Sequence, residues 1–345
     1  MDSSGPESER PDPSTLFPGP ADLPLGFGTW ALGGTDWGPI EPAVAKRLLR
    51  TARDLGFRHF DTAESYGNGR SEQLLGQALR DDLRRDRESY VIASKSVVRA
   101  PRPLGRHLER SLRRLGTEYV DLFYIHWPRE GVDLHAAVEE LLRQVDLGRI
   151  RWIGLSNVSR REYEEIAGTF PVAAVQAGYN ALWRGPEKDL WPAVRCARVA
   201  YSPLAQGLLA RPFPSDPDWP EGDHRQKTPL FSKPLWSAVH RFHQEYLRAC
   251  RDHDLHPGAT AIAWLLGTKW SGRRTLPRAS AAVVGGRRPR DVQELVTGLE
   301  AAYTPEGARR CTAALEEVEQ AYTRVEGMLP VLPNIFGYVP RAANP

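Results

Sequence analysis

Four polar side chains in the first part of the chain have the types needed to deliver a proton to a carbonyl oxygen. Asp61 and Tyr66 lie in the stretch Phe-Asp-Thr-Ala-Glu-Ser-Tyr-Gly, on a predicted strand-to-helix loop, and Lys95 and His126 each end an apolar run. A phenol titrates near pH ~10 and is a poor acid at neutral pH unless a cation lowers its pKa. We therefore expect Lys95 to lower the pKa of Tyr66, and Asp61 to keep the ammonium charged. His126 is expected to orient the carbonyl through an imidazole N–H.

Each of these residues also has a purely structural explanation. A histidine at a strand end is more often structural, an Asp-Thr pair after a strand often caps a helix, and a tyrosine in a glycine-rich turn usually packs. The four residues, however, follow or end consecutive predicted strands. Because all four lie at the ends of neighbouring strands, a catalytic group is favoured over four independent structural roles.

The elements that must position these residues alternate regularly along the chain. The predicted strands are 25–32, 57–61, 90–95, 119–126, 150–156, 172–176, 197–202 and 281–284. The predicted helices are 42–55, 71–80 (capped by Ser71), 104–115, 134–147, 159–168, 235–253, 259–266, 289–302 and 305–325, with a short helical stretch near Leu190. Strands that alternate with helices predict either a doubly wound parallel sheet or a closed barrel.

The barrel is the better prediction. Eight near-continuous apolar strands, with no GxGxxG after the first, favour a single-domain α/β fold, the (β/α)8 or TIM barrel, with an extra C-terminal helix. Such a barrel gathers the carboxyl ends of all its strands at one mouth. The polar residues noted above lie at those ends.

Composition excludes several classes of function. The 345 residues carry a net charge of +3, which gives no reason to expect a nucleic acid or membrane partner. No signal pattern or membrane-spanning apolar run is present, so the cytoplasm is the expected compartment. Three widely spaced cysteines predict free thiols. The nine histidines form no metal-ligand pattern, so no metal site is expected.

The chain divides into three predicted parts. Residues 1–19 are expected to be a disordered leader, 20–327 the barrel and 328–345 a tail that covers the barrel mouth. The tail is apolar over 328–338, which suits either a lid over the barrel or a contact in an oligomer. The Arg-rich stretch 269–280 is expected to be an inserted surface loop rather than a binding element.

Several sequence blocks resemble the signatures of the aldo-keto reductases. The blocks are 60–67, 92–95, 121–128, 153–157, 175–180 and 201–209, in the right order within a resemblance that covers about 26–299. The resemblance implies a (β/α)8 barrel that binds NADP(H) without a Rossmann domain and interconverts a carbonyl and an alcohol. It implies Tyr66 as the general acid, supported by Lys95 and Asp61, and His126 as the residue that orients the carbonyl.

The resemblance also implies the cofactor-binding residues. Ser156, Asn157 and Gln176 correspond to the group that grips the nicotinamide carboxamide, and Tyr201 to the aromatic that stacks on the ring. The other implied positions are Gly28, Thr29, Trp30 and Asp61 near the ribose and nicotinamide, Ser202, Pro203, Leu204, Gln206 and Gly207 along the pyrophosphate, and Gly285, Arg287, Asp291 and Glu294 at the adenosine phosphate.

Two residues depart from the family pattern in the adenosine-phosphate block. Asp291 stands where a Gln or Arg is usual, and Leu295 where an Asn is usual. An aspartate near a 2′-phosphate is repulsive, although Arg287 and Arg288 still favour one. An NAD-dependent sugar or alcohol dehydrogenase therefore stays open as an alternative. A nicotinamide-nucleotide-sensing regulatory protein is the less favoured alternative.

The sixth helix of the barrel is also expected to be truncated.

The substrate is expected to be a small carbonyl or alcohol compound bound by Trp30, Tyr66, His126 and Trp127. Trp37 and the segment 213–231 are further candidates for the pocket wall. Within that segment His224, Arg225 and Lys227 are more readily explained as a surface charge run. Whether the protein is a monomer or a homo-oligomer stays open.

Overall fold

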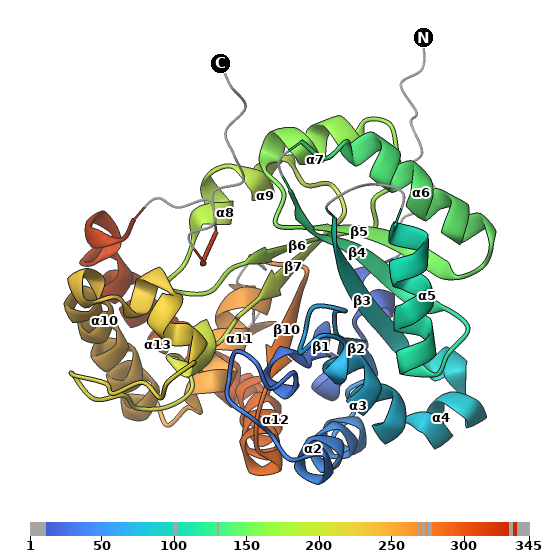
Figure 1. Cartoon of the computed structure of the whole chain (residues 1–345). Coiled ribbons are helices and arrows are strands. Elements are labelled where there is room, and N and C mark those ends of the chain that lie inside the picture. Colours follow the sequence, from blue (N-terminus) through green and yellow to red (C-terminus); the bar gives the residue numbers. More distant parts are fainter. Residues whose placement is uncertain are drawn as a thin grey trace.

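The computed structural model describes residues 12–98, 103–129, 131–267, 269–270, 273–274, 278–330 and 334–336. Its centre is a closed barrel of eight parallel strands surrounded by helices (Figure 1). The barrel strands are β1 (Leu25–Gly28), β2 (His59–Asp61), β3 (Val91–Val98), β4 (Val120–Pro128), β5 (Ile150–Ser156), β6 (Ala174–Gly178), β7 (Ala197–Tyr201) and β10 (Ala281–Gly285). Each strand pairs with its neighbours in chain order, and β10 pairs with β1 to close the ring. The predicted (β/α)8 fold is confirmed.

The predicted helices are present after the strands, and the structure adds two that we did not predict, α1 and α4. In chain order the helices are α1 (Pro13–Leu16), α2 (Pro42–Asp54), α3 (Arg70–Ala78), α4 (Arg80–Arg85), α5 (Leu104–Leu115), α6 (Leu134–Asp146), α7 (Arg160–Ala167), α8 (Gly185–Lys188), α9 (Leu190–Ala193), α10 (Lys233–Asp252), α11 (Pro257–Leu266), α12 (Pro289–Ala302) and α13 (Pro305–Thr323). Single 3-10 turns span Pro20–Asp22, Trp30–Leu32, Arg87–Ser89, Ala205–Gly207, His224–Lys227, Pro229–Phe231 and Glu326–Met328. The two four-residue helices α8 and α9 confirm that the sixth helix is truncated.

Two local predictions at strand and helix ends are wrong. The first strand ends at Gly28 instead of 32, because Trp30–Leu32 turns into a 3-10 helix. Helix α3 begins after Gly69, and Ser71 lies inside it as a buried residue. The Ser71 hydroxyl is 2.6 Å from the Thr29 hydroxyl, so it ties α3 to the end of β1 instead of capping the helix.

The barrel interior is filled by side chains from alternate strands. Tyr124 of β4 is fully buried there, in a cluster with Leu122, Val199 and Val283. A Cβ at Gly154 of β5 would collide with the Tyr124 ring, so this glycine makes room for the largest interior side chain. The barrel is a packed core and not a pore, and chemistry is confined to its mouth.

The amino ends of the strands are closed by a segment that we predicted to belong to a disordered leader. Residues 1–11 lie outside the described residues, but within 12–19 Leu16 and Phe17 are buried. Phe17 stacks on His59 with ring centroids 4.3 Å apart, and the Leu16 carbonyl lies 2.6 Å from Nδ1 of His59. Apolar burial therefore outweighs the polar composition of the leader at these positions.

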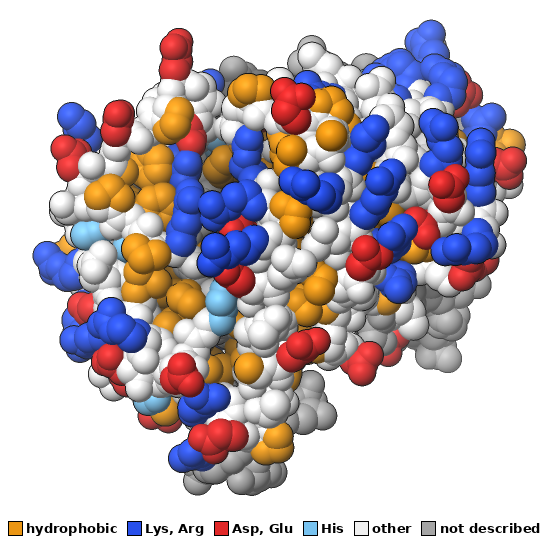
Figure 2. Space-filling model, turned by 90° about the horizontal axis from the view of Figure 1, so that it is seen from below, with side chains coloured by type: hydrophobic (Ala, Val, Ile, Leu, Met, Phe, Trp, Pro, Cys, Tyr) orange, Lys and Arg blue, Asp and Glu red, His pale blue; other side chains and the backbone are white. Residues whose placement is uncertain are grey.

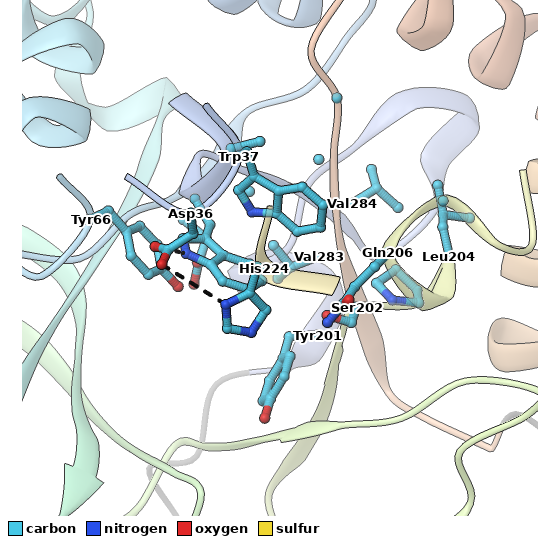
Figure 3. Close-up of a pocket in the computed structure, with 18 of the residues that line it drawn as sticks. Asp36, Trp37, Tyr66, Tyr201, Ser202, Leu204, Gln206, His224, Val283 and Val284 are labelled. Carbon is cyan, nitrogen blue, oxygen red and sulfur yellow. Dashed lines mark hydrogen bonds and ion pairs between the residues drawn. The ribbon is translucent and has the colours of Figure 1, made fainter. Parts of the chain in front are cut away.

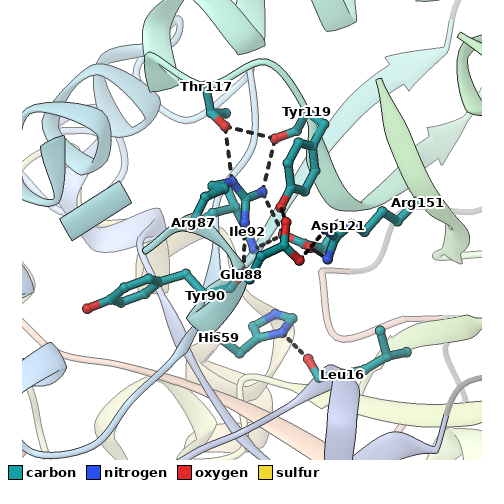
Figure 4. A network of polar contacts seen from close by, with 10 residues as sticks. All are labelled: Leu16, His59, Arg87, Glu88, Tyr90, Ile92, Thr117, Tyr119, Asp121 and Arg151. Carbon is teal, nitrogen blue, oxygen red and sulfur yellow. Dashed lines mark hydrogen bonds and ion pairs between the residues drawn. The ribbon is translucent and has the colours of Figure 1, made fainter. Parts of the chain in front are cut away.

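A polar network lies at the same end of the barrel (Figure 4). The buried carboxylate of Asp121 accepts hydrogen bonds from Arg87 at 2.7 Å, Arg151 at 3.2 Å and the backbone N–H of Ile92 at 2.8 Å. Arg87 also lies over the ring of Tyr119, 3.9 Å from its centroid. Because this end of the barrel is far from the mouth, we assign the network to stability.

Side chains of both charges are interspersed with hydrophobic ones on the face drawn in Figure 2. Within the described ranges, no helix has the length and apolar character needed to cross a membrane. Among the described residues the three cysteines form no disulfide, and Cys250 and Cys311 are buried. Five of the twelve residues of the 269–280 insertion lie outside the described residues; its described parts include a short antiparallel hairpin of β8 (Lys269–Trp270) and β9 (Arg273–Arg274).

Candidate active site

The four predicted catalytic residues meet at the carboxyl ends of β2, β3 and β4. The Lys95 ammonium is completely buried and donates hydrogen bonds to the Asp61 carboxylate, to the Thr62 carbonyl at 2.9 Å and to the Tyr66 hydroxyl at 3.2 Å. The His126 ring stands edge-on to that of Tyr66, with centroids 5.6 Å apart. The barrel thus brings together side chains that are separated by 65 residues along the chain, between 61 and 126.

The loop that carries Tyr66 is fixed by backbone contacts. The Thr62 N–H donates to the Ala93 carbonyl at 2.9 Å, and the Glu64 N–H to the Lys95 carbonyl at 3.1 Å, so the loop continues the pairing of β2 with β3. Gly67 then turns the chain with φ of +60°. A Cβ there would collide with the Gly33 carbonyl, and glycine is therefore required both for the turn and for the close approach of the two loops.

Burial decides the protonation states of this group. The pKa of Tyr66 is raised well above its usual value, first because burial disfavours the phenolate and then because of the Asp61 and Asp36 charges. Our expectation that Lys95 brings this pKa below its ordinary value is therefore wrong for the site as it stands, because burial and the two carboxylate charges raise the pKa. Burial lowers the pKa of Lys95, opposed by Asp61.

His126 is neutral at physiological pH. Burial, reinforced by the Lys95 charge, holds its pKa well below the usual value. Nδ1 of the ring lies 3.4 Å from the Ser65 hydroxyl. A neutral imidazole can donate one N–H into the mouth without adding a second positive charge beside the ammonium.

The residues expected to grip a carboxamide form a hydrogen-bonded row beside the catalytic group. Nε2 of Gln176 donates to Asp61 Oδ2 at 2.9 Å. The Asn157 amide donates to the His126 carbonyl at 3.0 Å and to the Ser156 hydroxyl at 3.1 Å, and its oxygen accepts from the Tyr201 hydroxyl at 2.7 Å. The row is rigid because each amide is engaged on more than one side or with a charged partner.

A cavity of about 2000 Å³ opens above the catalytic group. Of the predicted cofactor and substrate residues only Thr29 is absent from its wall; the Thr29 hydroxyl is buried and donates to the Asp61 carbonyl at 2.9 Å. The predicted residues that line it are Gly28, Trp30, Asp61, Tyr66, His126, Trp127, Ser156, Asn157, Gln176, Tyr201, Ser202, Pro203, Leu204, Gln206, Gly207, Gly285, Arg287, Asp291 and Glu294. The wall extends from Tyr66 and His126 to the start of α12.

The residues of this wall fit a nicotinamide dinucleotide. Ser202, Ala205 and Gln206 have positive φ values of 51°, 46° and 56°, which keep the loop after β7 tightly turned along the cavity. Both polar atoms of the Gln206 amide are buried and find no hydrogen-bond partner among the described residues. Buried unpartnered amide atoms on a cavity wall are what a bound polar ligand can satisfy. Figure 3 shows this loop across the cavity from Tyr66.

The far end of the cavity is rich in arginine. Arg287 donates to the backbone carbonyls of Trp37, Gly38 and Pro39, the last at 2.9 Å, and so bridges the loop after β10 to the loop after β1. Arg288 pairs with Asp291 at 2.7 Å. Asp291, which we expected to repel a phosphate, thus has its charge matched. Arg211 also lines this end, and burial together with the charges of Arg225 and Arg288 lowers its pKa.

The opposite wall contains Asp36, which the sequence did not single out, and residues of the segment 213–231, which we named as a candidate for the pocket wall. Asp36 accepts a hydrogen bond from the Trp30 indole at 2.9 Å, and its second carboxylate oxygen lies 3.9 Å from Nδ1 of His224 (Figure 3). The expectation that His224 and Arg225 belong to a surface charge run is wrong, since the His224 side chain is only 14% exposed and Arg225 is buried. The signal available in the sequence was the density of aromatic residues around this run.

Phe336, which belongs to the tail that we expected to cover the mouth, is a further wall residue. Its ring is parallel to that of Tyr201, with centroids 5.8 Å apart, and edge-on to Trp30 at 5.6 Å. It also meets Trp127 at 6.1 Å. The described part of the tail therefore lies over the mouth, next to both tryptophans that we expected to bind substrate.

No metal site accompanies this cavity: among the described residues, no three His, Cys, Asp or Glu side chains cluster in a way that could hold an ion.

Comparisons with known proteins agree with this geometry. The profile of the Aldo/keto reductase family matches residues 24–316. The chain is 31% identical over 300 residues to Aldo-keto reductase YhdN of Bacillus subtilis (strain 168), which covers 79% of this chain and 85% of that protein. It is 28% identical over 260 residues to Aldo-keto reductase yakc [NADP(+)] of Schizosaccharomyces pombe, covering 70% and 76%. The solved structure of the glycerol dehydrogenase AKR11B4 from Gluconobacter oxydans matches with a TM-score of 0.73 and 25% identity, over 93% of this chain and 94% of that chain.

Proposed function

This chain belongs to the aldo/keto reductase family and is an oxidoreductase, and we propose that it uses NADP(H) to interconvert a small carbonyl compound and its alcohol. The observation that carries the proposal is the contact of the buried Lys95 ammonium with both Asp61 and Tyr66 at the floor of a long cavity. The nicotinamide supplies the hydride when it is bound. The chain supplies the proton and the positions of the reacting atoms.

Tyr66 is the proposed general acid. Its raised pKa keeps the phenol protonated at neutral pH, so a proton is available when negative charge develops on the substrate oxygen. When that proton leaves, the phenolate oxygen lies 3.2 Å from the Lys95 ammonium, which stabilises it. Asp61 keeps the ammonium charged against the effect of burial.

His126 is the proposed residue that orients the substrate oxygen. Because the imidazole is neutral, it polarises the carbonyl by hydrogen bonding and does not compete with Tyr66 as the acid. Its ring lies edge-on to Tyr66, so a carbonyl oxygen between the two can meet both donors.

The cofactor is proposed to lie along the wall described above. Ser156, Asn157 and Gln176 are positioned for the carboxamide and Tyr201 for the nicotinamide ring. The remaining positions of the wall take the ribose, pyrophosphate and adenosine, with Gln206 contributing its unpartnered amide. NADP(H) is favoured over NAD(H) by the arginines at the far end and by the relative whose name specifies NADP(+).

Oxidation of a polyol with NAD is the second candidate. It is favoured by the likeness to a glycerol dehydrogenase and by the engagement of Arg288 with Asp291 and of Arg287 with backbone carbonyls. To bind the 2′-phosphate of NADP(H), both arginines would have to give up these contacts, whereas NAD(H) requires no such change.

Titration of tryptophan fluorescence with NADPH and with NADH separates the two candidates, since Trp30 lines the cavity. Tight NADPH binding and at least ~10-fold weaker NADH binding support the proposal. We place Arg211, which lines the arginine-rich end of the cavity, beside the 2′-phosphate that only NADPH carries, so the difference in affinity between the two cofactors should narrow in an Arg211→Met variant. Equal binding of the two cofactors, or preference for NADH, favours the polyol dehydrogenase.

Turnover of a panel of aldehydes tests the chemistry. Tyr66→Phe should lower kcat by about 100-fold or more while NADPH binding persists. Tyr303→Phe is the matched control, because that hydroxyl is buried outside the cavity and has no hydrogen-bond partner among the described residues. Full turnover by Tyr66→Phe refutes the general-acid assignment. Tight NADPH binding without turnover of any carbonyl or alcohol indicates a nucleotide sensor instead.

A further inference from the structure

Two polar atoms in the wall of the substrate end have no hydrogen-bond partner among the described residues. They are Nε2 of His224 and Nε1 of Trp37, both buried. The two rings are neighbours, with centroids 6.3 Å apart, and both line the cavity. An indole nitrogen can only donate a hydrogen bond, whereas an imidazole nitrogen can donate or accept.

The surroundings of His224 make Nε2 an acceptor. Nδ1 faces the Asp36 carboxylate at 3.9 Å, which favours the N–H on that nitrogen and leaves the lone pair on Nε2. Asp36 itself is held in place, because the indole of Trp30 and the hydroxyl of Thr35 both donate to it, at 2.9 and 3.1 Å. Burial lowers the pKa of His224, with Lys227 adding to this and Asp36 opposing it, so the neutral ring prevails at pH 7.

Phe336 packs against His224 and against Trp30, the ring beside this pair, in the structure. Its ring meets His224 edge-on at 5.1 Å and Trp30 at 5.6 Å. A phenyl ring can satisfy neither nitrogen, and each buried polar group left unpaired is costly. A ligand that supplies both a donor and an acceptor at this place is therefore favoured over Phe336.

We propose that Trp37 and His224 form a subsite for a hydroxyl group of the substrate, which Phe336 seals until the substrate enters. A hydroxyl is both donor and acceptor, so its hydrogen can pair with Nε2 of His224 and its oxygen can accept from Nε1 of Trp37. Only the Trp30 ring separates His224 from Tyr66, at centroid distances of 4.7 and 6.4 Å. The substrate class is therefore a carbonyl compound that carries a hydroxyl several bonds from the reacting carbon, with an apolar body against the aromatic wall.

A carboxylate does not fit the same place. It offers acceptors only, so it could pair with Trp37 but would face the lone pair of His224 and lie close to the Asp36 charge. An apolar substituent leaves both nitrogens unpaired, as Phe336 does. The subsite should therefore favour a substrate with a hydroxyl substituent over one with an alkyl substituent, and the alkyl substituent over a carboxylate.

The test rests on the proposed function and uses three para-substituted benzaldehydes with NADPH: 4-(hydroxymethyl)-, 4-ethyl- and 4-carboxybenzaldehyde. The first two are nearly equal in size and differ by one hydroxyl. In the wild-type protein kcat/KM for the hydroxymethyl compound should exceed that for the ethyl compound by about 10-fold or more. The difference should lie mainly in KM, because the hydroxyl is remote from the bond that changes.

Two variants remove one nitrogen each while keeping an aromatic ring. His224→Phe and Trp37→Phe should each lower the hydroxymethyl-to-ethyl ratio by about 3- to 10-fold, and His224→Gln, which retains an acceptor, should restore part of it. Phe336→Ala should lower KM for the hydroxymethyl compound by removing the competing ring. His135→Phe is the matched control, because this half-exposed histidine packs on Phe170 outside the cavity and should leave the ratio unchanged.

The outcomes separate this inference from the proposed function. A wild-type ratio near one, a ratio insensitive to both variants, or a preference for the carboxylate overturns the hydroxyl subsite while the reductase assignment stands. Absence of turnover of all three aldehydes by a protein that also fails to bind NADPH overturns the proposed function, and the subsite with it.

Discussion

Removal of the Lys95 ammonium is expected to destabilise the fold as well as abolish activity. In a Lys95→Met variant the Asp61 carboxylate stays buried and loses its only cationic hydrogen-bond donor among the described residues. The amide of Gln176, at 2.9 Å, is the remaining side-chain donor to it. An uncompensated carboxylate in such a site costs about 3–5 kcal/mol of unfolding free energy.

A double-mutant cycle separates the charge from the lost packing. Asp61→Asn alone leaves the ammonium unpaired and should be similarly costly, but Lys95→Met combined with Asp61→Asn buries no charge. We expect the double variant to be more stable than the sum of the single changes predicts, by about 1–3 kcal/mol. Lys188→Met is the control: this lysine forms an exposed pair with Glu326, and its replacement should change stability by less than about 0.5 kcal/mol.

Urea denaturation followed by circular dichroism at pH 8 and at pH 5 measures these free energies. The sign of the pH effect follows from the protonation of the lone carboxylate. In Lys95→Met it can be relieved by taking up a proton, which becomes easier as the pH falls, so the difference from wild type should shrink at pH 5. A cost below about 1 kcal/mol, or equal costs at both pH values, refutes the argument that a buried charge is left unpaired.

Three further perturbations test other parts of the structure. Asp121→Asn removes the carboxylate that two arginines and a backbone N–H share, and should cost about 2–4 kcal/mol in urea denaturation. Burial lowers the pKa of His243 to about 4, so the unfolded chain binds more protons than the folded one between pH 6.5 and pH 4. Stability should therefore fall as the pH drops through this window, by at most about 1.4 kcal/mol per pH unit from this residue, and His243→Asn should flatten the curve. Gly67→Ala should cost about 2 kcal/mol or more and reduce kcat, because a Cβ there collides with the neighbouring loop, whereas Gly34→Ala, with φ of +88° but open space, should cost about 1 kcal/mol.

Each of these predictions has a result that contradicts it. The Asp121 assignment fails if the variant is no less stable than Glu164→Gln, which breaks an exposed pair. Constant stability from pH 6.5 to pH 4 contradicts a neutral buried His243. If Gly67→Ala and Gly34→Ala lower the unfolding free energy equally, the argument that Gly67 is required for the close approach of two loops is refuted.

The sequence by itself determined the barrel and which four residues meet as the proposed catalytic group. Strand and helix periodicities are local properties, so apolar runs such as 150–156 and helical runs such as 104–115 could be located without tertiary information. The group of Asp61, Tyr66, Lys95 and His126 followed from topology, because parallel strands place their carboxyl ends at one mouth. Hydrogen bonds and ring contacts in the structure join these residues as that topology requires.

Only the tertiary structure decided how far each side chain is buried and which residues surround it. The segment 213–231 and the tail were expected near the mouth from the sequence, but only the fold decides that Asp36, His224 and Phe336, from three separate loops, meet at one wall. The direction of the Tyr66 pKa was wrong from sequence because desolvation depends on everything packed around the phenol, whereas the nearby cation was visible in the motif. Phe17 was assigned to a disordered leader for the same reason: its local composition is polar, but the open end of the barrel provides an apolar site that buries it.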